Sequence, residues 1–377
     1  MPDKNEKSKE ILPIVIIGAG IAGLCISFYL NKKNISHIII EKGKAGNTWI
    51  EERWDNFHLV NPNWAMKIPE FGFESDHFPS KDPNGFLNKK EIVNYLQSFA
   101  RYLNSEIYEN EKVNKISKNN NSYEIQTSKR LIHTNTVIIA TGAFGNPYIP
   151  EIHKNLDKDI FQIHSSKYKN STGLPEGKVV VVGSGQSGAQ IAEDLLDSGR
   201  KVILAVSKCG RRPRKYRSKD SSWWNYEMGL FDKTVNDVKL EERWKCSAHT
   251  SGAKGGHDIN LIDLAENGLE LCGSVKNCQG NKLFLKDNVY ENVKFSDTYA
   301  INWRKNVDKF ITKNNIKVPQ ESIKIDERIE SNILNNYDHI LLNEEINSII
   351  WATGFRYNFD WIDLDIADKN NHPIQYR

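Results

Sequence analysis

The sequence has few cysteines, and none of them is spaced like a redox or metal motif. Its 377 residues contain five cysteines, an odd number, with no CxxC motif and no zinc-type spacing. These absences argue against a local redox dithiol and against a structural zinc site. A set without a pairing pattern is typical of a reducing compartment, so we expect a cytoplasmic protein. The five are Cys25, Cys209, Cys246, Cys272 and Cys278.

The sequence also has no large excess of charge of either sign. Its formal net charge is +3, with 26% charged and 39% hydrophobic residues. No global field therefore favours a nucleic acid or a membrane surface as partner. A chain of this length and composition can bury a sizeable core, and we expect two domains preceded by a disordered N-terminus over residues 1–10.

One uncharged run, Ile11–Leu30, is about long enough to span a bilayer. Three glycines interrupt its centre, however, and the preceding residues mix acids with bases, unlike the start of a signal peptide. We therefore favour a strand that turns tightly into a helix, and we expect no membrane anchor.

The glycines of this run, Gly18, Gly20 and Gly23, have the spacing of a dinucleotide-binding fingerprint. The first glycine permits the tight turn, the second lets a pyrophosphate approach the backbone, and the third lets the helix pack on the strand. The helix N-terminus then faces the phosphates. Glu41 ends the next apolar run, where an acid that binds ribose is expected.

A second fingerprint follows in KVVVVGSGQSGAQIAEDLLDSG, which begins at Lys178. Gly183, Gly185 and Gly188 repeat the first spacing, again after a valine-rich strand and before a helical pattern. Two complete fingerprints in one chain imply two dinucleotides. We infer that a chemical group passes between them.

No acid stands at the tip of the strand after the second fingerprint helix. An acid there would bind a 2′-hydroxyl and repel a 2′-phosphate, whereas cations and a hydroxyl favour the phosphate. We therefore predict NADPH rather than NADH. The alternatives are a solvated basic loop and a short nucleic-acid patch. The residues at this tip are Ser207, Lys208, Arg211, Arg212, Arg214 and Lys215.

Two buried strands run into the same Ala-Thr-Gly turn, at Ala140–Gly142 and at Ala352–Gly354. The repetition suggests that the chain leaves a first sheet and later returns to it. We predict an α/β fold of two Rossmann-like dinucleotide-binding domains, with the second, NADPH-binding domain inserted into the first. The predicted bounds are 11–152 and 350–377 for the first domain, which the resemblance given below identifies as the FAD domain, and 165–349 for the NADPH domain.

Two aromatic stretches have more than one interpretation. Residues 46–73 form either a loop that packs onto the first domain or a surface that lines a flat, ring-shaped ligand, and both roles are possible at once. Residues 221–232 form a substrate wall, a lid, a homodimer contact or buried packing.

Three further segments carry weaker patterns. Residues 88–103 have helical spacing of apolar side chains, and Val293–Phe295 reads as a strand. His249 and His257 flank a glycine-rich piece, but no further ligands accompany them, so we expect no metal site.

Taken together, the chain resembles the class B flavin-dependent monooxygenases, which include flavin-containing monooxygenases and their short bacterial relatives. The resemblance covers most of the chain. It depends on the strand end at Glu41 and on six motifs in a fixed order: GAGIAGL, GNTWIEERWDNF, ATGAFGNPYIP, HSSKYKN, GSGQSGAQIA and WATGF.

This resemblance implies that NADPH reduces FAD, that a C4a-hydroperoxyflavin forms with O2, and that one oxygen reaches a small apolar substrate. By position, the FAD residues are Gly18, Gly20, Gly23, Glu41, Gly46, Thr48, Trp49, Trp54, Val113, Thr141 and Gly142. The NADPH residues are Gly183, Gly185, Gln186, Ser187, Gly188, Ser207 and Lys208. Thr353 and Gly354, in the second Ala-Thr-Gly turn, are also predicted to bind a cofactor. Asn61 is the implied catalytic residue beside the flavin, with Val60 as the alternative alignment.

The chain departs from the family pattern in two places. In FQIHSSKYKN, His164 and Tyr168 match the end of the family motif, but the preceding gap is short and lacks its glycine. Sulfur or nitrogen oxidation and Baeyer–Villiger oxidation therefore both remain open. The family's closing strand and helix are expected to be absent after residue 377.

Three alternatives to a monooxygenase were weighed. A disulfide reductase is disfavoured, because Cys272 and Cys278 lie in a polar stretch far from either fingerprint. The other two are an NADPH oxidase that releases peroxide and a truncated, non-catalytic flavoprotein.

Overall fold

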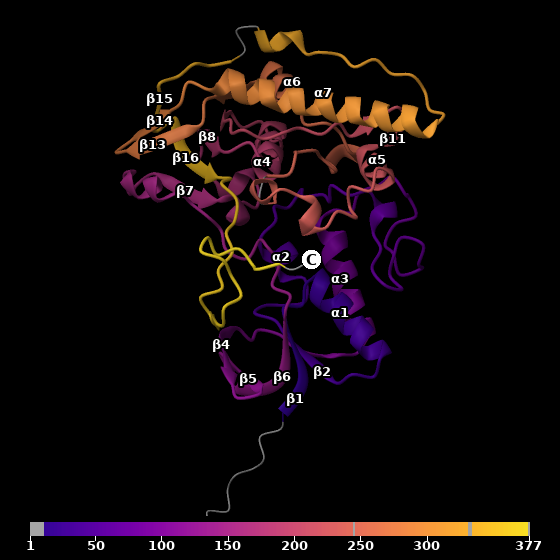
Figure 1. Cartoon of the computed structure of the whole chain (residues 1–377). Coiled ribbons are helices and arrows are strands. Elements are labelled where there is room, and N and C mark those ends of the chain that lie inside the picture. The colour runs from indigo at the N-terminus through magenta and orange to yellow at the C-terminus, as the bar shows by residue number, and fades with distance from the viewer. Residues whose placement is uncertain (1–10, 244–245, 331–333, 376–377) are drawn as a thin grey trace, which may run out of the picture.

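The computed structural model describes residues 11–243, 246–330 and 334–375. The chain folds into two α/β units, one above the other in Figure 1, and each is built on a sheet with parallel strands. The predicted fold class is confirmed. The predicted disordered segment, residues 1–10, lies outside the described residues.

The first unit contains a seven-stranded sheet in the order β17-β4-β5-β6-β1-β2-β3. Strand β1 runs parallel to both of its neighbours, β2 and β6, and the helices α1 and α3 pack on the sheet. The strands are β1 (Ile11–Ile17), β2 (His37–Ile40), β3 (Glu106–Tyr108), β4 (Val113–Asn119), β5 (Ser122–Thr127), β6 (Leu131–Ile139) and β17 (Ile362–Asp363). The helices are α1 (Ile21–Lys32), α2 (Asn47–Glu51) and α3 (Lys89–Leu103).

The uncharged run near the N-terminus is divided between β1 and α1, so it forms the expected strand, turn and helix rather than one long helix. Across the residues that the structure describes, none of the helices combines the length and the apolarity needed to cross a membrane.

Helix α3 forms as its spacing predicts. Asn88 caps its N-terminus, and the Asn88 and Glu91 side chains each accept a hydrogen bond from the other residue's backbone N–H. This capping box satisfies two amides that the helix itself leaves free. The five predicted apolar residues, from Ile92 to Leu103, are all buried.

The second unit contains a five-stranded sheet, β12-β9-β8-β16-β7, in which every neighbouring pair is parallel. Among the described residues, a three-stranded antiparallel sheet, a two-stranded hairpin and four α-helices complete it. The strands of the main sheet are β7 (Phe161–His164), β8 (Lys178–Val182), β9 (Val202–Ala205), β12 (Leu269–Cys272) and β16 (Ile346–Trp351). The smaller strands are β10 (Lys215–Tyr216), β11 (Lys219–Asp220), β13 (Val275–Gln279), β14 (Lys282–Leu285) and β15 (His339–Leu341). The helices are α4 (Gln186–Asp197), α5 (Ser221–Glu227), α6 (Leu261–Glu266) and α7 (Val289–Asn314).

The boundaries of the second unit differ from the predicted 165–349. The second sheet begins with β7 at Phe161 and includes β16 as far as Trp351, because β16 lies between β7 and β8 and pairs with both. The chain then returns to the first sheet, where Ile362 pairs with Ile116 of β4. The second unit is therefore inserted between β6 and β17 of the first.

Two segments discussed from the sequence are helical in whole or in part. The expected strand at Val293–Phe295 is wrong, because these residues lie in α7, which buries Val293, Ala300 and Trp303 on one face. In the second segment, α5 buries Trp224 completely in one cluster with Trp303. Buried packing is therefore the role of Trp224, whereas Phe231 at the end of the same stretch is 62% exposed.

Candidate functional site

The first fingerprint forms a tight turn between β1 and α1. Gly18 has a φ of +109°, and a Cβ added there would lie 2.6 Å from the carbonyl oxygen of Ala140. A Cβ on Gly23 would overlap the Gly18 carbonyl, whereas a Cβ on Gly20 would have nothing within 4 Å. The turn therefore needs its first and third glycines for packing, and the second glycine faces open space.

Two other predicted FAD segments converge on this turn. The Glu41 carboxylate is buried and accepts hydrogen bonds from the backbone amides of Ala19 and Gly43, each at 2.9 Å. Gly46 has a left-handed φ of +76° and donates its N–H to the Ala19 carbonyl at 3.0 Å. The structure thus brings Gly18, Glu41 and Gly46 together at one end of β1.

The aromatic loop after this turn provides both packing and partly open surface. Trp54 is 4% exposed and meets Phe57 edge to face, with 5.0 Å between ring centroids. Trp49, on α2 beside Thr48, is only partly buried, and the Arg53 guanidinium lies 5.3 Å from its ring centroid. The loop therefore packs on its unit through Trp54 and leaves Trp49 the more accessible ring.

Asn61, the implied catalytic residue, is exposed. Its neighbour Val60 accepts a hydrogen bond from Arg214 of the second unit at 2.7 Å, so this segment lies where the units meet. Asn63, two residues on, is buried and donates to the Asp82 carbonyl at 2.9 Å, and its side-chain oxygen finds no hydrogen-bond partner among the described residues. Val113 lies apart from these residues, partly buried at the start of β4.

The second fingerprint repeats the geometry of the first. Gly183 has a φ of +102°, and a Cβ there would lie 2.7 Å from the Ala352 carbonyl oxygen. A Cβ on Gly188 would overlap the Gly183 carbonyl. Gln186, which precedes the partly exposed Ser187 in the first turn of α4, exchanges two side-chain hydrogen bonds with the backbone of Thr250.

The two Ala-Thr-Gly turns thus occupy equivalent places, because Ala140 and Ala352 each pass against the first glycine of a fingerprint. Thr141 and Gly142 are exposed after the first of these contacts. In the second turn, Thr353 donates to the Tyr148 carbonyl at 2.5 Å. The position of Thr141 and Gly142 beside Gly18 is the one expected for residues near a cofactor.

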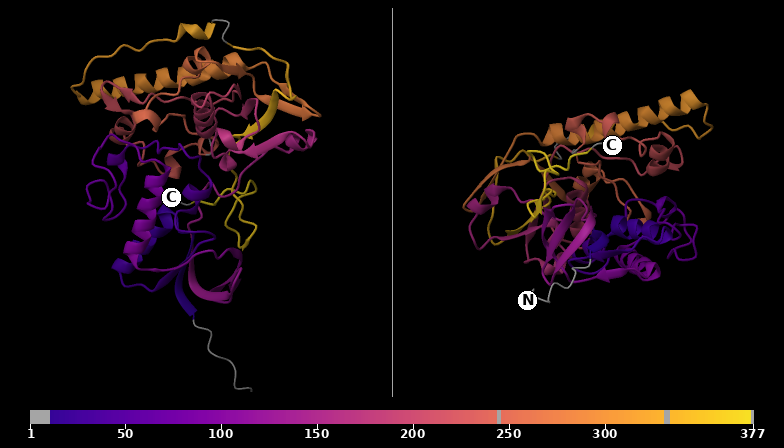
Figure 2. Two further views of the ribbon diagram at one scale, coloured as in Figure 1. Left: turned by 180° about the vertical axis from the view of Figure 1, so that it is seen from behind. Right: turned by 60° about the horizontal axis from the view of Figure 1, so that its bottom comes forward.

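The two chain segments that connect the units run side by side, as the views in Figures 1 and 2 show. Tyr148 donates its N–H to the Gly354 carbonyl at 3.0 Å, and Arg356 donates its N–H to the Asn146 carbonyl at 2.9 Å. The Arg356 guanidinium also lies 3.5 Å from the ring centroid of Tyr148. We refer to residues 140–148 and 352–356 as the two crossovers.

His164 and Tyr168, the residues that match the family motif, support this connection from the second unit. The Nε2 atom of His164 lies 2.9 Å from the Gly354 carbonyl oxygen, and burial lowers the pKa of its ring. The buried Tyr168 donates to Asp194 of α4 at 2.6 Å. Both residues therefore fix the second crossover and the fingerprint helix.

Ser207 and Lys208 lie at the tip of β9. The Ser184 amide, in the fingerprint turn, donates to the Ser207 hydroxyl at 3.1 Å. Lys208 is exposed, and its ammonium nitrogen lies 4.9 Å from the ring centroid of Phe295. Both side chains are thus placed at the edge of the second fingerprint.

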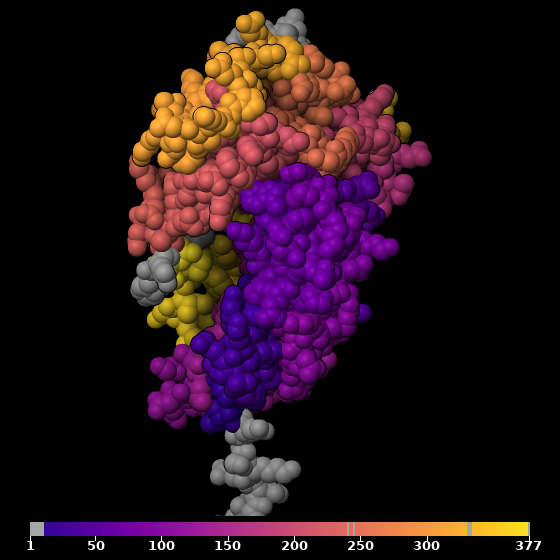
Figure 3. All heavy atoms as spheres, turned by 90° about the vertical axis from the view of Figure 1, so that its right-hand side faces the viewer, coloured from indigo at the N-terminus to yellow at the C-terminus, as the bar shows by residue number. Residues whose placement is uncertain are grey.

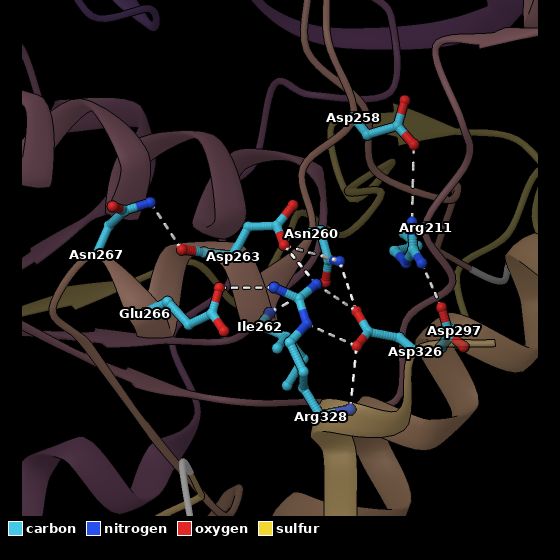
Figure 4. A network of polar contacts seen from close by, with 10 residues as sticks. All are labelled: Arg211, Asp258, Asn260, Ile262, Asp263, Glu266, Asn267, Asp297, Asp326 and Arg328. Carbon is cyan, nitrogen blue, oxygen red and sulfur yellow. Dashed lines mark hydrogen bonds and ion pairs between the residues drawn. The ribbon is translucent and has the colours of Figure 1, made fainter. Parts of the chain in front are cut away.

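Two of the arginines that follow are engaged inside the protein. Arg211 forms ion pairs with Asp297 and, at 3.7 Å, with Asp258, as Figure 4 shows. Arg214 pairs with Asp220 at 2.7 Å. Arg211 and Arg214, two of the cations that favoured a 2′-phosphate in the sequence, are therefore neutralised by nearby aspartates.

Arg212 differs from both neighbours. Burial lowers the pKa of its guanidinium, and its Nε atom has no hydrogen-bond partner among the described residues. The half-buried guanidinium feels the charges of both Arg214 and Asp220, and its Nε–H remains a donor that an anionic ligand could use.

The glycine-rich piece between His249 and His257 is explained by contact between the units. A Cβ on Gly252 would overlap the carbonyl oxygen of Leu59, and Gly256 lies against Phe86, so both glycines permit close approach to the first unit. Figure 3 shows the two units in contact, with a hollow beside them in which yellow atoms of the C-terminal part are visible.

The two histidines of this piece have separate partners. His249 is buried, its Nε2 lies 3.1 Å from the Ile259 carbonyl oxygen, and burial lowers its pKa to about 4. His257 lies 2.5 Å from Glu193, which raises its pKa. Within the described ranges, no group of three or more His, Cys, Asp or Glu side chains is placed to hold a metal.

Sequence reasoning missed one pair of side chains at the second fingerprint. Cys209 and Cys246 are 37 residues apart, and their sulfur atoms lie 3.6 Å from each other. No local sequence motif indicates this pair, because the two cysteines come together only when two loops meet.

Comparison with known proteins gives a family and a fold. Residues 15–242 match the family described as pyridine nucleotide-disulphide oxidoreductase. Over 372 residues the chain is 27% identical to an uncharacterised CzcO-like oxidoreductase of Geobacillus kaustophilus, covering 98% of this chain and 88% of that protein.

Two solved structures share the fold. A flavin-containing monooxygenase from Stenotrophomonas maltophilia has a TM-score of 0.64 at 16% identity, over 97% of this chain and 86% of that one. The structure of OTEMO in complex with FAD and NADP has a TM-score of 0.54 at 17% identity, over 96% of this chain and 75% of that one.

Proposed function

The chain belongs to the pyridine nucleotide-disulphide oxidoreductase family, and from that membership we propose an FAD- and NADPH-dependent monooxygenase that transfers one oxygen atom of O2 to a small apolar substrate. The observation that carries the proposal is the duplicated geometry, in which Gly18 and Gly183 each lie against an Ala-Thr-Gly turn. When bound, NADPH supplies a hydride and FAD supplies the chemistry that activates oxygen. The fold shared with flavin-dependent monooxygenases supports this pairing.

FAD fits the first fingerprint. Gly20 begins α1 without a side-chain cap and has open space where a side chain would project, so a pyrophosphate has access to the amides of the first helical turn. Glu41 would hold the ribose, as in other sites of this kind. Thr141 and Gly142 would lie along the bound group, as would Thr48 and Trp49.

NADPH fits the second fingerprint through Gly183, Ser187 and Gly188. The strand tips of the two units differ in one respect, because β2 is followed by Glu41 and β9 by the Ser207–Lys208 pair. A hydroxyl and a cation at this position favour a 2′-phosphate. Arg212, whose Nε atom has no hydrogen-bond partner among the described residues, is a further candidate to meet an anionic ligand in the same unit.

The remaining chemistry depends on how the chain positions the two sites. The crossovers hold the units together, and His164 contacts the Gly354 carbonyl of the second crossover. Phe144 and Phe355 meet edge to face across the crossovers at 5.3 Å, and Phe144 is 53% exposed. These rings, with Trp49, would provide an apolar surface for substrate, and Asn61 would lie beside the flavin at the contact between the units.

The test begins with the purified chain, whose visible flavin band and bound nucleotide are measured after gel filtration. NADPH consumption and peroxide release are then followed with a thioether, an amine or a ketone. Oxygenated product with little peroxide would support the monooxygenase. Peroxide equal to the NADPH consumed with every substrate would identify an oxidase, and failure to bind FAD would refute a catalytic flavoprotein.

A further inference from the structure

The Cys209–Cys246 pair stands out because the proposed reaction does not use it. Cys209 is 4% exposed in the loop after β9, and Cys246 is exposed in the segment that leads to Thr250. The Cys209 thiol donates to the Cys246 sulfur at 3.6 Å, and both cysteines are free.

The pair lies at the entrance to the second fingerprint. A Cβ on Gly185 would lie 3.0 Å from the Cys246 sulfur, whereas the equivalent position on Gly20 has nothing within 4 Å. Gln186 binds the backbone of Thr250, so the chain from Cys246 to Thr250 is fastened beside the first turn of α4. A pyrophosphate that approaches Gly185 must therefore displace the Cys246 side chain.

We propose that Cys209 and Cys246 form a reversible disulfide that holds this segment over Gly185 and closes the second dinucleotide site. The inference depends on the proposed function only for the identity of the dinucleotide. In the reduced protein, Cys246 is free to leave Gly185 when NADPH arrives. In the oxidised protein, the bond to Cys209 ties it to the end of β9, directly beside the fingerprint.

The geometry permits the bond. A disulfide needs an S–S distance of about 2.05 Å, so the sulfurs must close by about 1.5 Å from their present positions. Cys246 lies in an exposed segment outside any helix or strand, so its backbone can supply that movement without disrupting a sheet. The partner on the β9 side, Cys209, is the buried and fixed member.

Hydrogen peroxide, which an uncoupled flavoprotein releases, is an adequate oxidant. The Cys246 thiolate attacks one peroxide oxygen, so an S–O bond forms, the O–O bond breaks, and hydroxide leaves and takes a proton. The Cys209 sulfur then attacks the sulfenic sulfur, the S–S bond forms, the S–O bond breaks, and a second water leaves. In sum, two thiols and one peroxide give one disulfide and two waters.

The environment singles out Cys246 as the attacking sulfur. The hydrogen bonds from the Cys209 thiol and the Gln186 backbone lower the pKa of the exposed Cys246 thiol. Burial raises the pKa of Cys25 and brings those of Cys272 and Cys278 to about 12 and about 11. Because the thiolate is the reactive form, these three are poor competitors.

The experiment treats the reduced full-length protein with hydrogen peroxide, alkylates the remaining thiols, and maps cross-linked peptides by mass spectrometry. NADPH affinity is measured on the same samples by titration of intrinsic fluorescence. We expect a Cys209–Cys246 cross-link and at least a tenfold loss of NADPH affinity, both reversed by dithiothreitol. Cys246→Ser and Cys209→Ser should each bind NADPH without sensitivity to peroxide, and the control Cys25→Ser should behave like the parent.

The outcomes separate this inference from the proposed function. A cross-link between other cysteines, or none, would overturn the disulfide whatever the protein binds. A Cys209–Cys246 cross-link with unchanged NADPH affinity would overturn the closure of the site. If the reduced protein binds no NADPH, the proposed function fails and the site-closing role fails with it, while the mapped cross-link still decides whether the pair is a redox couple.

Discussion

Replacing Gly20 with alanine adds one methyl group, which should weaken cofactor binding without disturbing the fold. Its φ is −82°, which any residue adopts, and a Cβ there meets no protein atom within 4 Å. Gly20→Ala should therefore keep the parent melting temperature while its FAD affinity falls by at least about tenfold, or ~1.4 kcal/mol. The retained flavin band and circular dichroism measure the two effects.

Alanine variants at two other glycines serve as controls for this prediction. Gly173→Ala, whose nearest neighbour would lie at 3.7 Å, should change neither property. Gly23→Ala should destabilise the fold, because its Cβ would overlap the Gly18 carbonyl. Normal flavin binding by Gly20→Ala would contradict the assignment of the first fingerprint.

Lys208 is the second residue for which the structure predicts a specific effect on nucleotide binding. Because its exposed ammonium has no acidic partner within salt-bridge distance among the described residues, reversing its charge should leave the fold intact. Lys208→Asp should raise the dissociation constant for NADPH by about tenfold to a hundredfold, the worth of a charge-assisted hydrogen bond, while that for NADH stays near its parent value.

Fluorescence titration with both nucleotides checks the Lys208 prediction. Lys276→Asp, at an exposed position on β13, provides the control for a general change of charge. Equal weakening of NADPH and NADH would refute a role for Lys208 at the 2′-phosphate.

At the scale of elements, an ion-pair cluster holds the chain after α7 onto α6. Arg328 pairs with Asp326 and Asp263, each at 2.7 Å, and with Glu266 at 2.6 Å, as Figure 4 shows. Asn260 also donates to Asp326 at 3.0 Å. The cluster holds residues 326–328, which follow α7 in the chain, against α6. These residues are far in sequence from both fingerprints.

This ion-pair cluster predicts a contribution to the free energy of unfolding that is lost in acid. The hydrogen bond from Arg328 holds the pKa of Asp326 down to about 2, below its unfolded value near 4. The contribution, about 1 kcal/mol, should be present above pH ~4 and lost as the pH falls through the folded pKa. Urea unfolding at several pH values measures it, and Asp326→Asn should remove that part of the slope.

A matched variant again tests the cause. Asp365→Asn removes an exposed carboxylate and should leave the pH dependence as in the parent. If Asp326→Asn keeps the full parent slope between pH ~4 and ~2, other carboxylates carry the effect.

For the whole molecule, the contact between the units should control hydride transfer. Gly252 has a φ of −102°, so a side chain there is not strained by its own backbone but would collide with the Leu59 carbonyl. Gly252→Val should separate the units at this edge and slow flavin reduction by NADPH about tenfold or more, with both cofactors still bound.

Stopped-flow measurement of flavin bleaching checks the Gly252 prediction, and Gly173→Val provides the control. A parent-like reduction rate in Gly252→Val would mean that contact at this edge is not needed for transfer.

The parts of the molecule that could be predicted are those encoded by short stretches of sequence. Glycine spacing, valine-rich strands and the Asn88 cap each act within a few residues, and the predicted turns and helix α3 are observed. The family match and the shared monooxygenase fold confirm the predicted resemblance. The assigned cofactor contacts and Asn61 stay predictions.

The parts that could not be predicted depend on residues far apart in the chain. Asp297 neutralises Arg211 from a helix whose existence the sequence did not reveal, and Cys209 meets Cys246 across 37 positions. Trp351 joins the second sheet because β16 finds partners on both sides, which fixes the boundary between the units. Partners at such distances leave no periodic signal along the sequence.

The paired crossovers have a mechanical consequence. A single connecting strand would let one unit both bend and rotate about it, whereas two strands joined by the Tyr148–Gly354 and Arg356–Asn146 hydrogen bonds form a flat ribbon. Two connections bonded to each other limit rotation of one unit about the other more than a single connection would. The contacts of Gly252 with Leu59 and of Arg214 with Val60 restrict the same rotation at a second place.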